Sequence, residues 1–316
     1  MRGLRVMLCV VAMALALPAL AQPDLSRRVG KTVAEAPVPG YRFHALVVPT
    51  VDGATRYRLR VAVPERPAPR AGHPVAWLLD GNAALMDIQA DTLKQLAQAP
   101  SPPVIVFVAH DNDLRIDGDA RAYDYTPRRP GGEEAQRDPL GTRRNGGADA
   151  FLDFLTGEAR KKVGELAPID PARHALWGHS YGGVFVLHAL FTRPQAFAQF
   201  GAADPSLWWG DGHLLAEEKQ AVQWSGASPR VYLWTGQAAR PQAAAPHAPA
   251  GCDPGTIDAM RRARASVPAD AMERMVERQR ARGMTVEWET LPGLSHGQTL
   301  GASLPRFLAA VAATAP

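Results

Sequence analysis

The stretch that decides the fold is "ARHALWGHSYGGVFVLHALF", residues 172–191. The apolar run Ala175–Trp177 leads into Gly-His-Ser-Tyr-Gly, and a second apolar segment with helical spacing follows. A strand, a sharp turn and a helix in this order lift a serine hydroxyl above the end of the strand. Small residues are needed where backbone segments crowd in such a turn, and Gly178 and Gly182 supply them. We therefore predict that Ser180 is a nucleophile.

A second Gly-x-Ser-x-Gly match, "GLSHG" at 293–297, competes with the first. It follows the last predicted strand, precedes the final predicted helix and contains His296. In serine hydrolases with a strand–turn–helix elbow, the nucleophile comes first along the chain, the acid next and the histidine last. Because no histidine follows His296, Ser295 has no candidate base beyond it. We predict that His296 is the general base of Ser180.

The segments around these motifs alternate between predicted strands and helices. Besides the run before Ser180, strands are predicted over 42–48, 57–63, 75–81, 103–110, 230–236 and 285–293, and helices over 83–98, 148–166, 271–282 and 300–313. The first two strands form a hairpin across an Asp-Gly turn. The pattern predicts an α/β-hydrolase fold with a mainly parallel central sheet, helices on both faces and an antiparallel edge. Two stretches have no steady period: 111–147, predicted to be a functional or disordered loop, and the irregular insertion 237–269.

The N-terminus has the pattern of a secretory signal. Two arginines precede the apolar run Val6–Leu17, and Ala-Leu-Ala at 19–21 is a small-residue cleavage site. An uncleaved anchor is the alternative, but this apolar run is short for a bilayer span. We predict a signal peptide over residues 1–21 and a single exported α/β-hydrolase domain over 22–316, with no membrane anchor after cleavage.

Charge, cysteine and histidine content narrow the function classes. The formal net charge is +4, and loss of Arg2 and Arg5 with the signal would leave +2, so no nucleic-acid partner is expected. Cys9 would also leave, and Cys252 alone cannot form an internal disulfide. Histidines form no metal-binding spacing with cysteines or carboxylates, so no metal or organic cofactor is predicted. His188, inside the helix after Ser180, is interpreted as a packed, hydrogen-bonded residue.

The third catalytic residue is not evident. An acid is expected after strand 230–236, but the chain continues there as "QAARPQ", without a carboxylate. Asp253 and Asp258 come later in the insertion and would have to fold back to reach the histidine. We therefore predict a Ser–His dyad, in which a carbonyl or another polar group fixes the imidazole ring.

Main-chain N–H groups are predicted to stabilise the oxyanion. One is the N–H of Tyr181, the residue after the nucleophile. The second donor usually comes from the loop after an early strand, here "LLDGNAA" at 78–84, and we assign it to the main chain of Asn82. A plain turn at Asp-Gly-Asn is the alternative.

Six segments together resemble the putative-esterase family. They are "LLDGNAALM" (78–86), "RAYDYTP" (121–127), "RRNGGADAFLDFL" (143–155), "WGHSYGGVFVLHAL" (177–190), "DPSLWW" (204–209) and "GLSHG" (293–297). Within that family the sequence is most similar to periplasmic esterases that hydrolyse trilactone siderophores of the enterobactin and salmochelin type. The similarity runs in order over most of the mature chain and is weakest across 212–290. "RAYDYTP" with the downstream Gly-Gly is its most particular part.

The resemblance implies an α/β-hydrolase fold, a Ser–His dyad and a role for Arg121 near the scissile ester and the oxyanion. A guanidinium suits that role because it is always charged and has several fixed donors. The residues alone favour a loop arginine paired with Asp119 or Asp124. Trp208 and Trp209 are candidates for packing on catechol rings or for the core.

These observations predict an exported serine esterase that cleaves a catecholate trilactone siderophore, ferric or iron-free, in the periplasm to aid iron release. Iron would arrive only as part of the substrate, and association with the siderophore-uptake machinery is expected. A general exported carboxylesterase or acyltransferase would use the same two residues. A non-catalytic siderophore-binding protein is the alternative from another class.

Overall fold

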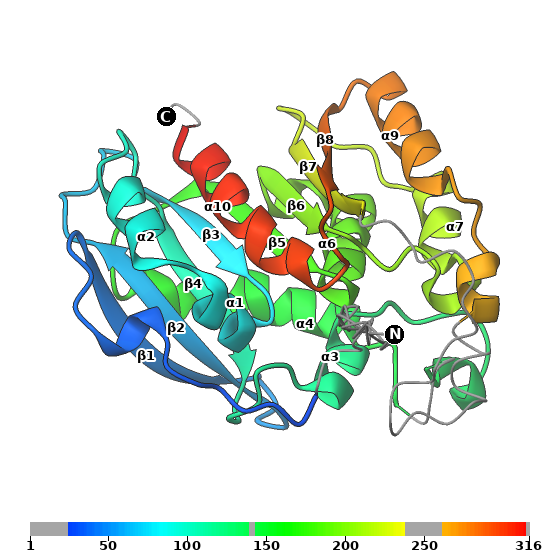
Figure 1. Ribbon diagram of the computed structural model, residues 1–316, viewed down its shortest axis with the longest axis horizontal. Helices are drawn as coiled ribbons and strands as arrows, with labels where there is room; N and C mark the ends of the chain where they lie inside the picture. The colour runs from blue at the N-terminus through cyan, green and yellow to red at the C-terminus, as the bar shows by residue number, and fades with distance from the viewer. Residues whose placement is uncertain (1–24, 139–142, 238–260, 314–316) are drawn as a thin grey trace, which may run out of the picture.

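The fold is built on one eight-stranded sheet (Figure 1). The structure is a computed structural model that describes residues 25–138, 143–237 and 261–313. The strands lie in the order β1-β2-β4-β3-β5-β6-β7-β8. Their bounds are β1 Tyr41–Pro49, β2 Arg56–Pro64, β3 His73–Leu78, β4 Val104–His110, β5 Ile169–His179, β6 Gln199–Ala203, β7 Arg230–Gln237 and β8 Thr285–Pro292. β1, β2 and β4 pair antiparallel and the remaining pairs are parallel, so the predicted sheet with an antiparallel edge is confirmed.

Helices cover both faces of the sheet (Figure 1). One face packs against α1 Gly81–Asp87, α2 Ala90–Ala97 and α10 Gln298–Ala313. The other packs against α3 Gly118–Asp124, α4 Ala148–Phe154, α5 Arg160–Gly164, α6 Tyr181–Thr192, α7 His213–Lys219 and α9 Ala271–Ala281. Successive residues of a central strand enter opposite cores, as Val75 and Ala76 do, because strand side chains alternate between the two faces.

α6 is the central helix of the fold. Every residue from Tyr181 to Phe191 is buried, which is typical of a helix packed on all sides. α10 instead buries one face and exposes the other. The sequence predicted both helices, and both follow a Gly-x-Ser-x-Gly segment.

Several predicted elements differ from those observed. The predicted helix 83–98 is two helices, because Ile88 and Gln89 are extended. The stretch 111–147 contains α3 and a 3-10 turn, η2 Glu133–Gln136, within its described part. Strand β6 was not predicted, since "QFGAA" is short and rich in glycine and alanine, which have low strand propensity. The helix predicted over 148–166 is continuous, with a π-helical turn, η3 Leu155–Ala159, between α4 and α5.

The remaining short helices are η1 Val33–Glu35, η4 Pro194–Ala196 and η5 Trp209–Asp211. The predicted signal peptide and most of the insertion 237–269 lie outside the described residues. Across the ranges that are described, no helix is both long and apolar enough to cross a bilayer.

Candidate active site

Ser180 sits on a strained turn between β5 and α6. Its backbone has φ 60° and ψ −114°, a conformation rarely adopted outside glycine. Its N–H donates to the carbonyl of Ala203 at the end of β6 (3.0 Å). A Cβ on Gly178 would lie 2.4 Å from the carbonyl oxygen of Gly182, so the turn can close only with glycine there. Such strain persists only where the surrounding structure enforces it, which is typical of a functional site.

His296 reaches this serine from the loop between β8 and α10. Its Nε2 lies 3.1 Å from Ser180 Oγ, within hydrogen-bond distance. The neighbouring Ser295 has a different role, because its N–H and hydroxyl both donate to Gln298 Oε1 (2.9 Å each) at the start of α10. The structure therefore brings together the predicted serine and histidine and leaves Ser295 as a helix-capping residue. The catalytic roles of Ser180 and His296 stay predictions.

A second hydroxyl lies beside that of Ser180. Ser206 is buried, and its Oγ lies 3.2 Å from Ser180 Oγ. Its N–H also donates to the Ser180 carbonyl (3.3 Å). If Ser180 donates to His296, Ser206 is left as the donor to Ser180. Sequence reasoning missed this residue, although it belongs to the quoted segment "DPSLWW".

His179 holds the main chain of the loop that carries His296. It is buried, and its Nε2–H donates to the carbonyl of His296 (2.7 Å). Burial and then the neighbouring His296 hold the pKa of His179 well below its ordinary value, so the ring is neutral. The hydroxyl of Thr299 donates to the same carbonyl (2.7 Å). Two donors thus fix the main chain of His296.

A carboxylate also lies beside His296. Asp204 Oδ2 lies 3.2 Å from His296 Nδ1, so an acid does lie beside the histidine, and the Ser–His dyad stays a prediction. Asp204 directly follows β6, the strand that the sequence did not predict. Asp253 and Asp258, the carboxylates considered from the sequence, lie outside the described residues.

Arg121 lies close to the elbow but is neither in a loop nor paired as the residues suggested. It belongs to α3, and its guanidinium binds Asp80 with two bonds, Nε to Oδ1 (3.0 Å) and Nη2 to Oδ2 (2.9 Å). Nη2 also donates to the carbonyl of His179 (3.1 Å). Burial lowers the pKa of Arg121, but the Asp80 carboxylate outweighs it and raises that pKa above its ordinary value.

The alternative partners proposed for Arg121 are occupied elsewhere. Asp119 pairs with Arg143, and Asp124 accepts from Tyr57 (2.9 Å) and lies 2.8 Å from His110 Nε2. The Arg121 side chain is only 11% exposed. It therefore links the turn after β3 to the elbow after β5, and direct contact with an oxyanion stays a prediction.

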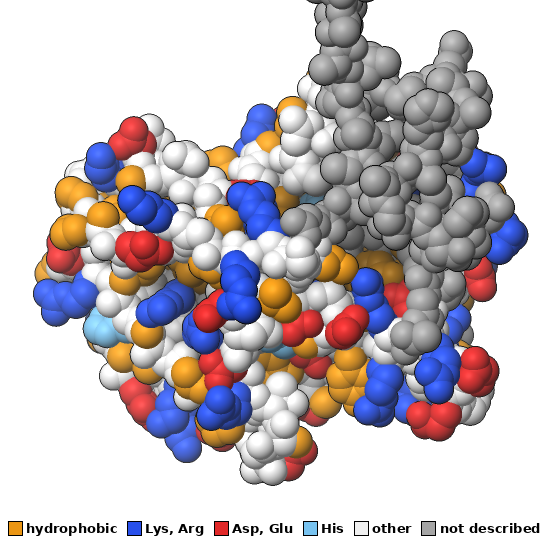
Figure 2. Space-filling view, turned by 60° about the horizontal axis from the view of Figure 1, so that its bottom comes forward, with side chains coloured by type: hydrophobic (Ala, Val, Ile, Leu, Met, Phe, Trp, Pro, Cys, Tyr) orange, Lys and Arg blue, Asp and Glu red, His pale blue; other side chains and the backbone are white. Residues whose placement is uncertain are grey.

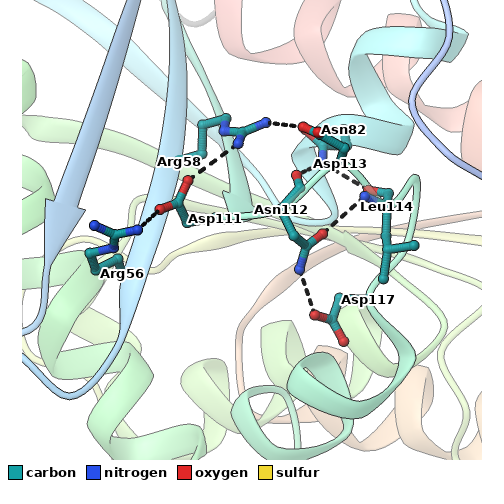
Figure 3. A network of polar contacts seen from close by, with 8 residues as sticks. All are labelled: Arg56, Arg58, Asn82, Asp111, Asn112, Asp113, Leu114 and Asp117. Carbon is teal, nitrogen blue, oxygen red and sulfur yellow. Dashed lines mark hydrogen bonds and ion pairs between the residues drawn. The ribbon is translucent and has the colours of Figure 1, made fainter.

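The side chain of Asn82 holds the loop after β4 (Figure 3). Its Nδ2 donates to the carbonyls of Asn112 (3.3 Å) and Leu114 (2.8 Å). Asn112 in turn donates to Asp117 (2.7 Å), whose side chain caps the N-terminus of α3. Asn82 thus helps to position the helix that carries Arg121.

The predicted oxyanion donors start two neighbouring helices. Tyr181 is the first residue of α6, and Asn82 lies in the first turn of α1. Main-chain N–H groups in a first turn have no partner within the helix. A Cβ on Gly182 would lie 3.6 Å from Asp80 Oδ2, so the two helix starts are close. The donor roles of both N–H groups stay predictions.

The other candidate residues have structural partners. His188 Nδ1 lies 2.8 Å from Glu217 Oε1, as expected for a packed, hydrogen-bonded histidine. Trp209 is fully buried in the core, whereas Trp208 is half-buried and its ring centroid lies 6.2 Å from that of Tyr181. Among the described residues, no group of three or more His, Cys, Asp or Glu could hold a metal ion.

The surface shows mixed charge. In Figure 2, basic and acidic side chains are interspersed over the visible face. Arg128 pairs with Glu133, and the guanidinium of Arg144 lies over the ring of Tyr123 at 5.1 Å. Attraction of an anionic ligand would therefore depend on individual arginines.

Comparison with known proteins adds a family and named relatives. A family model described as putative esterase matches residues 54–290, more than half of the chain. The apo-salmochelin esterase of Escherichia coli is 38% identical over 196 residues, which are 62% of this chain and 61% of that protein. The chain thus spans less than two thirds of that relative's length.

Two solved structures have the same fold. The enterobactin and salmochelin hydrolase IroE has a TM-score of 0.67 and 29% identity, and the match covers 89% of this chain and 99% of that one. A second structure is of IroE in complex with DFP, with the same TM-score, identity and coverage. The predicted α/β-hydrolase fold is confirmed by this likeness and by the mostly parallel sheet.

Proposed function

Because this chain belongs to the putative-esterase family, we propose that it is a serine hydrolase whose nucleophile is Ser180 and whose general base is His296. The observation that carries the proposal is the 3.1 Å contact between Ser180 Oγ and His296 Nε2 at a strained elbow. A nucleophile and base within hydrogen-bond distance are the signature of covalent acyl transfer. The relative bound to DFP supports the same chemistry, since organophosphates react with activated serines.

The first step acylates the serine. Ser180 Oγ attacks the ester carbonyl while its proton passes to His296 Nε2. The tetrahedral oxyanion then collapses, the bond from carbon to the leaving oxygen breaks, and the imidazolium protonates that oxygen. In the second step, His296 takes a proton from water as the water oxygen attacks the acyl carbon. The second tetrahedral oxyanion collapses, the bond from carbon to Ser180 Oγ breaks, the imidazolium returns its proton to Oγ, and the carboxylic acid leaves. The free serine is regenerated.

The oxyanion is held by donors at two helix starts. The N–H of Tyr181 and the N–H of Asn82 are the proposed donors, since first-turn N–H groups are available and point outward along the helix axis. Arg121 contributes by tying Asp80 to the carbonyl of His179. This clamp keeps the two helix starts at a fixed separation, which donors aimed at a developing charge require.

The proposed substrate is a catecholate trilactone siderophore of the enterobactin or salmochelin type. The names of the relatives in Escherichia coli and of IroE support it. Hydrolysis opens the lactone ring that preorganises three catechols around one iron, so affinity for the metal falls. Ferric iron therefore enters as part of the substrate.

Chromatography of ferric and iron-free enterobactin after incubation with the purified protein tests the substrate. Linear trimers and shorter products are expected with the parent and not with Ser180→Ala. Intact trilactone in both samples, with rapid cleavage of simple acyl esters, would favour a general carboxylesterase or acyltransferase. Tight binding without turnover that is indifferent to Ser180→Ala would favour a non-catalytic siderophore-binding protein.

We further propose that the protein works in the periplasm, where an imported siderophore first arrives. The signal-like N-terminus and its Ala-Leu-Ala site support export. Fractionation of producing cells should recover the mature chain, beginning at Gln22, in the periplasmic fraction. A chain that keeps Met1 and remains in the cytoplasm would contradict this. Co-purification with the siderophore-uptake machinery is the corresponding test of the proposed partner.

A further inference from the structure

We propose that Asp204 is a positioning residue that orients His296 and completes a Ser180–His296–Asp204 triad. The inference rests on the proposed function, because it assigns a third member to the same site. It places the acid after β6, next to the nucleophile strand, and not after β7, where the sequence pattern led us to expect it.

The topology brings the three residues together. β5 and β6 are parallel neighbours, so their carboxyl ends meet at one edge of the sheet. Ser180 follows the first strand and Asp204 follows the second. Main-chain hydrogen bonds fix both positions, from Ser180 N–H to Ala203 O (3.0 Å) and from Asp204 N–H to Trp234 O (2.7 Å).

The imidazole of His296 bridges the other two side chains. Its Nε2 lies 3.1 Å from Ser180 Oγ, and its Nδ1 lies 3.2 Å from Asp204 Oδ2. A carboxylate beside Nδ1 favours the tautomer with the proton on that nitrogen. The lone pair of Nε2 is then free to accept the serine proton, and the carboxylate stabilises the imidazolium that results.

The backbone at Asp204 is strained in a way that suits a functional position. Its φ is 43°, one of the few positive values at a non-glycine residue in the described part of the chain. Such a residue persists where its surroundings require it. Asparagine and aspartate tolerate this region better than other side chains, so Asp204→Asn preserves the backbone preference while removing the charge.

The end of β7 is shaped to admit this carboxylate. A Cβ on Gly236 would lie 3.3 Å from Asp204 Oδ2 and 2.6 Å from the carbonyl oxygen of Leu294. The bare glycine therefore lets both Asp204 and the histidine loop approach the strand. This explains physically why no side chain, acidic or other, projects from that position.

The surroundings of His296 predict that loss of the Asp204 carboxylate has a moderate effect on the catalytic rate. Asp204 is 24% exposed and His296 is 42% exposed, so water screens their attraction. From the elbow, His179 faces the same ring at a centroid distance of 4.7 Å and is neutral. Loss of the acid in a buried triad costs about 10⁴-fold in kcat, and we expect about 10²-fold here.

The test compares Asp204→Asn with the parent by the rate at which DFP labels Ser180 and by the hydrolysis of a nitrophenyl ester across pH. Both rates should fall about 10²-fold, with KM within about twofold because substrate contacts are unchanged. Thermal midpoints should stay within about 2 °C.

Three aspartates serve as matched controls. Asp211 is exposed, lies at the end of η5 and, like Asp204, has a positive φ (56°). Asp211→Asn should leave both rates unchanged. Asp253→Asn and Asp258→Asn test the two acids considered from the sequence. The proposal is overturned if Asp204→Asn stays within twofold of the parent, if its loss appears in KM and not in kcat, or if Asp253→Asn or Asp258→Asn shows the loss instead.

Failure of the inference is distinguishable from failure of the proposed function. A parent enzyme that DFP labels at Ser180 but that leaves the trilactone intact would overturn the substrate and not the triad. A parent enzyme whose Ser180 is not labelled at all would overturn both.

Discussion

At residues 178–182 the Gly-x-Ser-x-Gly pattern forms a strained turn between β5 and α6, whereas at 293–297 it forms an open loop between β8 and α10. In the first segment, a Cβ on Gly178 would clash with a backbone oxygen at 2.4 Å, whereas a Cβ on Gly182 would make an ordinary contact at 3.6 Å. In the second, nothing lies within 4 Å of a Cβ on Gly293 or Gly297. The same five-residue pattern thus closes a crowded turn at Gly178, whereas in the open loop Gly293 supplies a left-handed backbone conformation (φ 73°).

The serines differ in the same way. Ser180 has the positive φ of 60° and its hydroxyl lies 3.1 Å from an imidazole. Ser295 uses both its N–H and its hydroxyl to bind Gln298. A serine motif therefore indicates a nucleophile only when the strand before it and the helix after it force the turn to be tight.

The largest expected effect separates the two serines. Ser180→Ala should reduce ester hydrolysis by about 10⁴-fold or more, because the nucleophile is lost. Ser295→Ala should keep kcat/KM within about threefold, since only a helix cap is removed, at a stability cost of about 1 kcal/mol. Steady-state hydrolysis of a nitrophenyl ester measures both. Comparable losses of activity in the two variants would contradict the assignment of Ser180, and not Ser295, as the nucleophile.

The second effect tests how the elbow is supported. Arg121→Ala leaves Asp80 buried without its partner, and we expect a loss of about 3–5 kcal/mol in the free energy of unfolding. Urea unfolding measures this loss. The matched control is Arg306→Ala in the middle of α10, whose exposed pair with Glu289 should contribute less than about 1 kcal/mol. Equal costs would contradict the clamp.

Much of this difference could be predicted from the sequence, because patterns of apolar residues are local. The apolar strand and helix around Ser180 predicted the elbow, and the position of His296 after the last predicted strand placed it opposite the serine. Asp204 was missed because "QFGAA" has neither the length nor the branched residues that indicate a strand. Because β6 was not predicted, the sequence could not show that the carboxyl ends of β5 and β6 lie side by side.

Contacts between segments that are distant in the sequence could not be predicted from the pattern of apolar residues. Arg121 and Asp80 are 41 positions apart in the sequence. Arg121 lies in α3, which was not predicted because residues 111–147 show no helical period. His179 and His296 meet through a main-chain carbonyl, which no side-chain motif encodes. These links depend on how loops pack, and a single sequence carries little information about that.

The third effect is a pH dependence of the folding stability, caused by His188 in the helix that follows the elbow. His188 in α6 lies 2.8 Å from Glu217 and 3.5 Å from Asp149. Burial lowers the pKa of His188, but these two carboxylates outweigh it and raise that pKa to about 9. Stabilisation by the charged ring should be complete below pH 6.5 and lost as pH rises through about 9.

His188→Gln checks that dependence. Relative to this variant, the parent should lose about 3 kcal/mol of unfolding free energy between pH 6 and pH 10. Urea unfolding at several pH values measures the difference. Parallel curves for the two proteins would mean that the folded state holds His188 neutral.

The smallest effect compares the flanking glycines. Gly178→Ala should cost about 1–3 kcal/mol, since its Cβ would meet a backbone oxygen at 2.4 Å. Gly297→Ala meets nothing and should change stability by less than about 1 kcal/mol, in either direction. Thermal unfolding of the two variants gives the comparison. A loop variant as destabilised as the elbow variant would show that both turns are tight.

The most direct measurement is peptide mapping by mass spectrometry after DFP treatment of the parent protein. The account predicts a single modified serine, Ser180, with labelling abolished in Ser180→Ala and retained in Ser295→Ala. An adduct on Ser295, or an unmodified Ser180 in a protein that still hydrolyses esters, would contradict it.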